Sequence, residues 1–186
     1  MVPRMAEKLH FLPVDLQVHR SQVFDLMAEY HEWMAKEIRE RGKIDFLAVR
    51  GFSSFREYVA NDFERLISEV SSRGLFYLVE FDGTIIGMGA LDQIREKTGA
   101  IKRMYIRPAY RGKGIGKALL QQLLQKAKEF GYHSVYLDTA KFMTAAHNLY
   151  RSFGFVECEE YPETEILPRI RPYWLCMKKT LKDTTK

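Results

Sequence analysis

The chain has 186 residues, of which 46% are hydrophobic and 28% charged, which is enough apolar material for one domain with a substantial core. No stretch approaches the ~18 consecutive apolar residues of a membrane helix, and no apolar segment of signal-peptide length opens the sequence. The two cysteines, Cys158 and Cys176, fit reduced thiols and lack the spacing of a metal site. We therefore expect a single cytoplasmic domain over residues 1–186, with its core at about 9–181 and with no metal.

The cations concentrate in one part of the chain. The formal net charge of +5 suits nucleic acid, a membrane surface or a small anion, and it is also an ordinary aid to solubility. The clustered cations are Arg103, Arg107, Arg111, Lys113 and Lys117. A nucleic-acid binder would need a basic face interleaved with exposed aromatic residues. Cations gathered in one stretch instead favour a compact anion, so we expect neither nucleic acid nor a membrane as a partner.

The first part of the chain predicts two helices after a weakly supported strand at residues 10–15. Apolar residues recur at helical spacing over residues 23–38, and Gly42 follows as a stop. A second helix begins at Ser54, where Ser54 and Glu57 form a capping-box pattern in which each side chain satisfies the other residue's backbone N–H. Its apolar face continues to Val70.

The middle of the chain predicts a hairpin and then a crossover. Strands at 75–81 and 84–91 are joined by Asp82-Gly83, a dipeptide suited to a two-residue turn. A strand at 100–106, a leucine-rich helix at 119–130 and a strand at 134–139 form a right-handed crossover with parallel strands. The expected late elements are a helix at 144–153 and strands at 155–161 and 173–179. The fold class is therefore α/β, an α+β mixed sheet flanked by helices.

A glycine-rich segment opens the leucine-rich helix. Unpaired N–H groups in a first helical turn and the helix dipole attract phosphate, and glycines let the backbone approach it closely. Two familiar phosphate motifs fail on spacing: a P-loop would need Gly where Arg111 stands and Ser or Thr where Ala118 stands, and the dinucleotide fingerprint would need Gly at Lys117. An anion site of a different kind is therefore expected here.

Two segments carry a family resemblance. Residues 111–117 resemble the Arg/Gln-x-x-Gly-x-Gly/Ala signature of the GNAT superfamily of N-acetyltransferases, and "AAHNLYRSFGF" resembles its A-x-x-L-Y-x-x-x-G-F segment. Element order and length agree over about residues 74–178. The resemblance implies a GNAT-like acyl-CoA N-acyltransferase fold: a predominantly antiparallel sheet with one parallel strand pair splayed at the CoA site, flanked by helices.

The resemblance also implies how acetyl-CoA binds. It places the pyrophosphate on the glycine loop and the pantetheine and acetyl carbonyl against the backbone of the preceding strand, where an N–H would stabilise a developing oxyanion. The implied cofactor-binding residues are Met104, Tyr105, Ile106, Arg111, Gly112, Lys113, Gly114, Ile115, Gly116, Lys117 and Asn148. Asn148 fits a CoA contact and a solvent-facing residue equally well.

The catalytic groups are less complete. The resemblance makes Tyr150 the general acid that protonates the departing thiolate, and a core aromatic residue is the alternative. The carboxylate that members often carry before the loop is missing, since Ala100 and Lys102 bracket that place. The general base stays unassigned, with Asp92, Asp138 and Glu80 as candidates, each of which also fits a solvated or hydrogen-bonded carboxylate.

An acceptor site is implied at the junction of the first two helices and at the loop before the last strand. Its candidate residues are Phe46, Phe52, Glu160, Tyr161, Glu163 and Glu165, where carboxylates would attract a cationic amine and aromatic rings would pack on its carbon skeleton. A solvated acidic loop is the alternative.

The expected function is transfer of the acetyl group of acetyl-CoA to an amine of a small molecule, by direct attack in a ternary complex. The alternatives are an inactive CoA-binding module and a protein N-terminal or lysine acetyltransferase. The resemblance makes a homodimer plausible, but the sequence does not decide it.

Overall fold

The computed structural model describes residues 8–42, 45–68, 74–166 and 168–181. Its elements in chain order are β1 (Leu9–Pro13), α2 (Leu16–Gly42), α3 (Phe46–Arg50), α4 (Phe55–Ser68), β2 (Leu75–Phe81), β3 (Thr84–Arg95), β4 (Thr98–Ile106), η1 (Pro108–Tyr110), α5 (Ile115–Glu129), β5 (Ser134–Ala140), α6 (Thr144–Ser152), β6 (Val156–Cys158), η2 (Pro168–Tyr173) and β7 (Trp174–Thr180).

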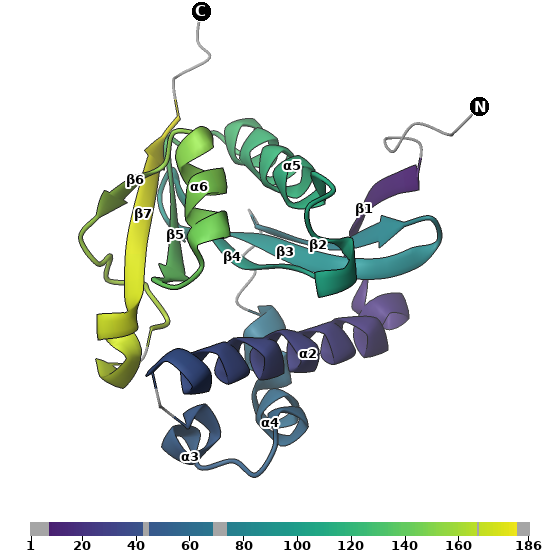
Figure 1. The fold of residues 1–186 in the computed structure, drawn as a ribbon. Helices are drawn as coiled ribbons and strands as arrows, with labels where there is room; N and C mark the ends of the chain where they lie inside the picture. Colours follow the sequence, from purple (N-terminus) through teal and green to yellow (C-terminus); the bar gives the residue numbers. More distant parts are fainter. Residues whose placement is uncertain (1–7, 43–44, 69–73, 167, 182–186) are drawn as a thin grey trace, which may run out of the picture.

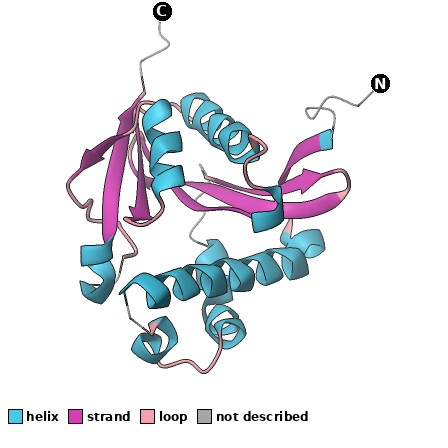
Figure 2. Cartoon of the chain, viewed as in Figure 1, coloured by secondary structure: helices cyan, strands magenta, loops and turns pink. Residues whose placement is uncertain are grey.

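One mixed sheet forms the middle layer of the molecule (Figure 1). The strand order is β1-β2-β3-β4-β5-β7-β6, and β4–β5 is the parallel pair among antiparallel neighbours. Figure 2 shows helices on both sides of this sheet. The first core, with α2 and α4, lies on one face, and the second, with α5 and α6, lies on the other. The predicted mixed sheet flanked by helices is confirmed.

The two parallel strands stay together only briefly. Their pairing runs from Thr98↔Ser134 to Ala100↔Tyr136, and beyond it β4 remains paired with β3 while β5 remains paired with β7. Within β4 the register to β3 shifts, and Arg103 in the shifted stretch has a φ of 53°. A bulge of this kind bends a strand and increases its twist. The sheet therefore opens between β4 and β5.

Local sequence signals explain several element ends. Asp82 and Gly83 have φ values of 52° and 76°, as a two-residue hairpin turn with both central residues left-handed requires. Ser54 caps α4 as predicted, since its Oγ accepts from Glu57 N at 3.1 Å. The reciprocal bond differs from the capping-box prediction, because the Glu57 carboxylate accepts from Ser53 N at 2.9 Å and from Ser53 Oγ at 2.5 Å.

Other boundaries depart from the predictions. The first helix is longer than its apolar period and begins at Leu16. The short helix α3 was not predicted, although Asp45 caps it by accepting from the backbone N–H groups of Leu47 and Ala48. The strand predicted at 155–161 ends at Cys158 because Tyr161 turns inward, and its hydroxyl donates to Asp138. The predicted end of the second helix lies partly in residues 69–73, outside the described residues.

Gly87 tests the close approach of β3 to the end of β4. A Cβ on Gly87 would lie 2.4 Å from the backbone oxygen of Tyr105, so Gly87→Ala should destabilise the fold by about 1–3 kcal/mol. Gly116→Ala is the matched control, because its Cβ would meet atoms no closer than 3.8 Å. Thermal unfolding of both variants measures this difference. Equal melting temperatures for Gly87→Ala and the unaltered protein would contradict it.

Candidate active site

A cavity of about 710 Å³ occupies the opening between β4 and β5. Side chains of α2, β4, β5 and α6 line it, together with residues of the segment between β6 and β7. Of the residues predicted from the sequence, those in the lining are Phe46, Met104, Tyr105, Ile106, Arg111, Asp138, Tyr150 and Glu165. The structure thus brings residues from six distant segments to one place.

The glycine loop reaches this opening through Arg111, which lines the cavity, whereas residues 112–117 lie outside the lining. Gly112 and Gly114 have φ values of 76° and 79°, which favour glycine, and Gly114 is the N-cap of α5 without a side-chain hydrogen bond. The N–H of Ala118 donates to the Gly114 carbonyl at 3.0 Å and is the first donor of the helical ladder. The N–H groups of residues 115–117 precede that bond and point out of the helix end. They are the donors that an anion would meet.

Arg111 is held in place by its neighbours. Its Nε donates to the Ile106 carbonyl at 2.8 Å, and its guanidinium lies 4.3 Å from the ring centre of Trp33. Lys113 lies 5.2 Å from the ring centre of Tyr110. The glycine loop is therefore tied to the end of β4 and to α2 through Arg111.

Helix α2 also fixes the end of β4. The Tyr105 hydroxyl donates to Glu29 Oε1 at 2.9 Å, and Arg107 Nε donates to Glu29 Oε2 at 2.9 Å. One carboxylate therefore holds the residues on both sides of Ile106. Sequence reasoning missed Glu29 because it considered only the apolar face of α2.

Tyr150 lies on the sheet-facing side of α6 and is 8% exposed. Burial, and secondarily the charge of Asp138, raises the pKa of Tyr150 to about 12. The phenol therefore holds its proton at neutral pH and can donate it. Its ring also packs against Phe155 at 5.9 Å, so the geometry is compatible with both the acid and the core role.

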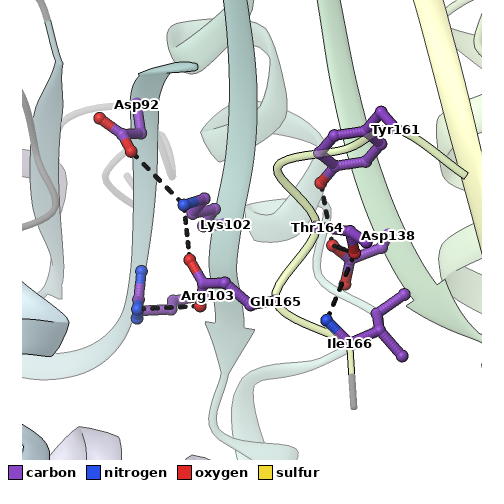
Figure 3. A network of polar contacts seen from close by, with 8 residues as sticks. All are labelled: Asp92, Lys102, Arg103, Asp138, Tyr161, Thr164, Glu165 and Ile166. Carbon is purple, nitrogen blue, oxygen red and sulfur yellow. Dashed lines mark hydrogen bonds and ion pairs between the residues drawn. The ribbon is translucent and has the colours of Figure 1, made fainter. Parts of the chain in front are cut away.

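Of the three candidate bases, Asp138 lines the cavity. Its Oδ2 accepts from the Tyr161 hydroxyl at 2.9 Å and from the Thr164 hydroxyl at 3.3 Å (Figure 3). Burial raises the pKa of Asp138, against the opposing effect of the Tyr161 hydrogen bond. Asp92 lies 3.4 Å from Lys102 Nζ, and Glu80 pairs with His10 and Ile85 in the sheet; neither contributes to the described cavity lining.

The predicted acidic loop is paired with cations. Glu160 lies 3.1 Å from Arg171, and Glu163 lies 3.3 Å from Arg95. Glu165 enters the cavity lining and contacts Lys102 and Arg103, as Figure 3 shows. These carboxylates therefore carry counter-ions of their own.

Phe52, Asn148 and Lys117 lie outside the described cavity lining. Phe52 packs against Tyr58, a lining residue, with ring centres 5.4 Å apart. Asn148 lies exposed on α6, and Lys117 lies exposed in the first turn of α5. Their positions leave the roles predicted for them untested.

Sequence reasoning missed Tyr30 in the cavity lining. Burial raises the pKa of Tyr30, and the charges of Asp138 and Glu165 add to the rise while Arg103 opposes it. The Tyr30 phenol is thus within electrostatic range of these groups at neutral pH and keeps its proton. In the sequence, a tyrosine on the apolar face of a helix looks the same whether it lines a cavity or packs in the core, so Tyr30 could not be identified in advance.

Asp138→Asn should stabilise the fold in a pH-dependent manner. The pKa of Asp138 in the folded protein is raised above its ordinary ~3.9, because burial disfavours the ionised carboxylate. The protonated acid therefore stabilises the fold fully below pH ~3.9, and this stabilisation is lost as pH rises through the folded-state pKa, whereas a neutral asparagine keeps it. The variant should therefore melt higher than the unaltered protein at pH 8 and equally at pH 4. Asp25→Asn on the exposed side of α2 is the control. A pH-independent difference would contradict the assignment.

The described residues contain no group of three or more His, Cys, Asp or Glu side chains placed to hold a metal ion. Among the helices in the described ranges, none combines the length and the hydrophobicity that a membrane crossing requires.

Comparisons with known proteins agree with this architecture. The chain is 34% identical over 83 residues to the uncharacterised N-acetyltransferase YjgM of Escherichia coli, a match covering 43% of this chain and 50% of that protein. An acetyltransferase from Streptococcus agalactiae has the same fold, with 19% identity, a TM-score of 0.67 and coverage of 94% of this chain and 99% of that one. A GNAT acetyltransferase from Elizabethkingia anophelis, solved with acetyl-CoA bound, is 25% identical with a TM-score of 0.52 and coverage of 63% and 83%.

The matches to three curated relatives cover 28%, 50% and 56% of the lengths of those proteins. The family model described as the acetyltransferase (GNAT) family matches residues 26–155, more than half of the chain. That range begins in α2, contains both strands of the opening, β4 and β5, and ends just after α6. The chain belongs to the GNAT family of acetyltransferases.

Proposed function

We propose that this protein is an acetyl-CoA-dependent N-acetyltransferase that acetylates a primary amine of a small molecule. One observation carries the proposal: a single cavity brings together Arg111 of the glycine loop, the carboxylate of Asp138 and the buried phenol of Tyr150. The family membership and the N-acetyltransferase names of the relatives support it. The Elizabethkingia anophelis neighbour with acetyl-CoA bound supports acetyl-CoA as the cosubstrate.

The residues present fit this cosubstrate. The N–H groups of residues 115–117 would bind the diphosphate, where the helix dipole also favours negative charge. The backbone of residues 104–106 borders the cavity and would meet the pantetheine arm. Acetyl-CoA supplies an acyl thioester that an amine attacks at the carbonyl carbon.

Asp138 and Tyr150 would handle the protons of this reaction. An alkylammonium must lose a proton before it attacks, and Asp138 is a carboxylate inside the cavity that can accept it directly or through water. As the C–N bond forms and the C–S bond breaks, Tyr150 would give its proton to the departing sulfur. Net, the ammonium loses two protons, of which one ends on the thiol and one in solvent.

Two alternatives from the sequence are less well supported. Asp138 places a carboxylate in the cavity lining, and a module that only binds CoA would have no use for a proton acceptor there. Phe46 from α3 and Ile170 from η2 are buried residues that line the cavity, and an enclosed cavity wall favours a small molecule over a protein chain.

An assay of a panel of amines, in which the release of free thiol from acetyl-CoA is measured, tests the proposal. Binding of CoA without turnover of any amine would favour the inactive module.

Tyr150→Phe tests the general acid. Loss of the phenolic proton should lower kcat by about 10²–10⁴-fold with little change in the KM for acetyl-CoA, because the ring still fills its place. Tyr77→Phe removes another buried hydroxyl, on β2 and outside the described cavity lining, and should leave kcat unchanged. Steady-state kinetics of both variants decides the matter, and full kcat in Tyr150→Phe would remove this tyrosine from the mechanism.

Paired substitution of Lys113 and Lys117 by Gln tests their contribution to CoA binding. Each exposed charge near the loop should contribute up to about 1 kcal/mol, so the double variant should bind CoA several-fold more weakly in low salt, with a smaller difference in high salt. Lys128→Gln, in the last turn of the same helix, changes the charge far from the loop. Calorimetry showing equal weakening by Lys128→Gln would point to a general charge effect.

A further inference from the structure

A buried arginine, Arg103, lines the cavity. Arg103 is 9% exposed, lines the cavity, and stands at the register shift of β4 with a φ of 53°. Its Nη2 lies 3.3 Å from Glu165 Oε2 (Figure 3). A guanidinium cannot give up its proton, so a buried arginine requires anionic or hydrogen-bonding partners. In this structure a carboxylate, that of Glu165, is one partner of this arginine.

The carboxylate that Arg103 holds in this structure belongs to an irregular segment. Glu165 lies between β6 and η2, and its side chain is 42% exposed. It also contacts Lys102 at 2.5 Å, and Lys102 lies 3.4 Å from a second carboxylate, Asp92. Lys102 would thus keep an acidic partner if Glu165 moved, whereas an incoming carboxylate could replace Glu165 at Arg103.

We infer that the acceptor is an α-amino acid with an apolar or aromatic side chain, whose carboxylate takes the place of Glu165 on Arg103. This inference rests on the proposed function. The ammonium would face Asp138, which lines the same cavity and is within electrostatic range of Glu165. The side chain would pack among the apolar lining residues Met34, Phe46, Tyr58, Ile166, Ile170 and Trp174.

The charges disfavour the other amine classes. A polyamine would need several carboxylates whose charge no protein cation neutralises, but Glu160, Glu163 and Glu165 are each paired with a cation. A simple alkylamine would make no use of Arg103. An α-amino acid carries one anionic and one cationic group on the same carbon atom, and Arg103 and Asp138, which line the same cavity, offer one charge of each opposite sign.

Matched acceptors test the inference on the unaltered protein. L-phenylalanine should be acetylated with a kcat/KM at least about tenfold above those of L-phenylalaninamide and 2-phenylethylamine, which lack the carboxylate. L-leucine and 3-methylbutylamine form a second pair. Equal or faster acetylation of the amines that lack a carboxylate would overturn the inference and leave the acetyltransferase proposal standing. No thiol release with any acceptor would overturn both.

Two variants separate a binding role of Arg103 from a structural one. Arg103→Lys should raise the KM for L-phenylalanine at least about tenfold more than it raises the KM for 2-phenylethylamine, because only a guanidinium can bind a carboxylate through two parallel N–H donors. Glu165→Gln should lower the KM for L-phenylalanine alone, because it weakens the internal competitor. Glu157→Gln is the control and should change neither KM, because Glu157 lies on β6 and pairs with Arg151 of α6. Parallel losses for both acceptors in Arg103→Lys, without a lower KM in Glu165→Gln, would overturn the inference.

Discussion

The structure depends on the parting of β4 from β5 after three parallel residue pairs. Each strand keeps its other neighbour, β3 or β7, so the sheet opens without losing its two outer halves. Because this pairing ends at Ala100 and Tyr136, the backbone groups beyond them have no partner strand across the gap, and a cavity lies there instead. The glycine loop follows β4 after the short helix η1, and α6 follows β5. Arg111 of the loop and Tyr150 of α6 both line the cavity in this opening. Figure 1 shows the strands and helices concerned.

Buried ionisable groups give this opening its chemistry and reduce the stability of the fold. Tyr30, Tyr150 and Asp138 all have raised pKa values with burial as the leading cause, and Arg103 lies buried among them. Hydrophobic residues at these places would fold more stably, as replacements of buried charges often do. The protein keeps polar groups in its interior, and these groups cluster around one cavity, which is the pattern expected where function opposes stability.

Signals that act over a few residues were readable from the sequence, while those that depend on distant contacts were not. The Asp82-Gly83 turn, the Ser54 cap and the glycine loop are local, and the structure contains each of them. Glu29 shows no local signal, because its role exists only once α2 packs against the end of β4. The position of Arg103 depends on a register shift against β3, which composition and periodicity do not encode. Asp138 was one of three equivalent carboxylates until the strands placed it in the cavity.

The central claim is that the opening between β4 and β5, with the glycine loop at its edge, receives the coenzyme. Amide NMR spectra of labelled protein during titration with CoA test it most directly. The account predicts saturable shifts concentrated at residues 104–106 and 112–117, with smaller changes at β1 and at the Asp82-Gly83 turn. Saturable shifts confined to other surfaces, or a spectrum that CoA leaves unchanged, would contradict it.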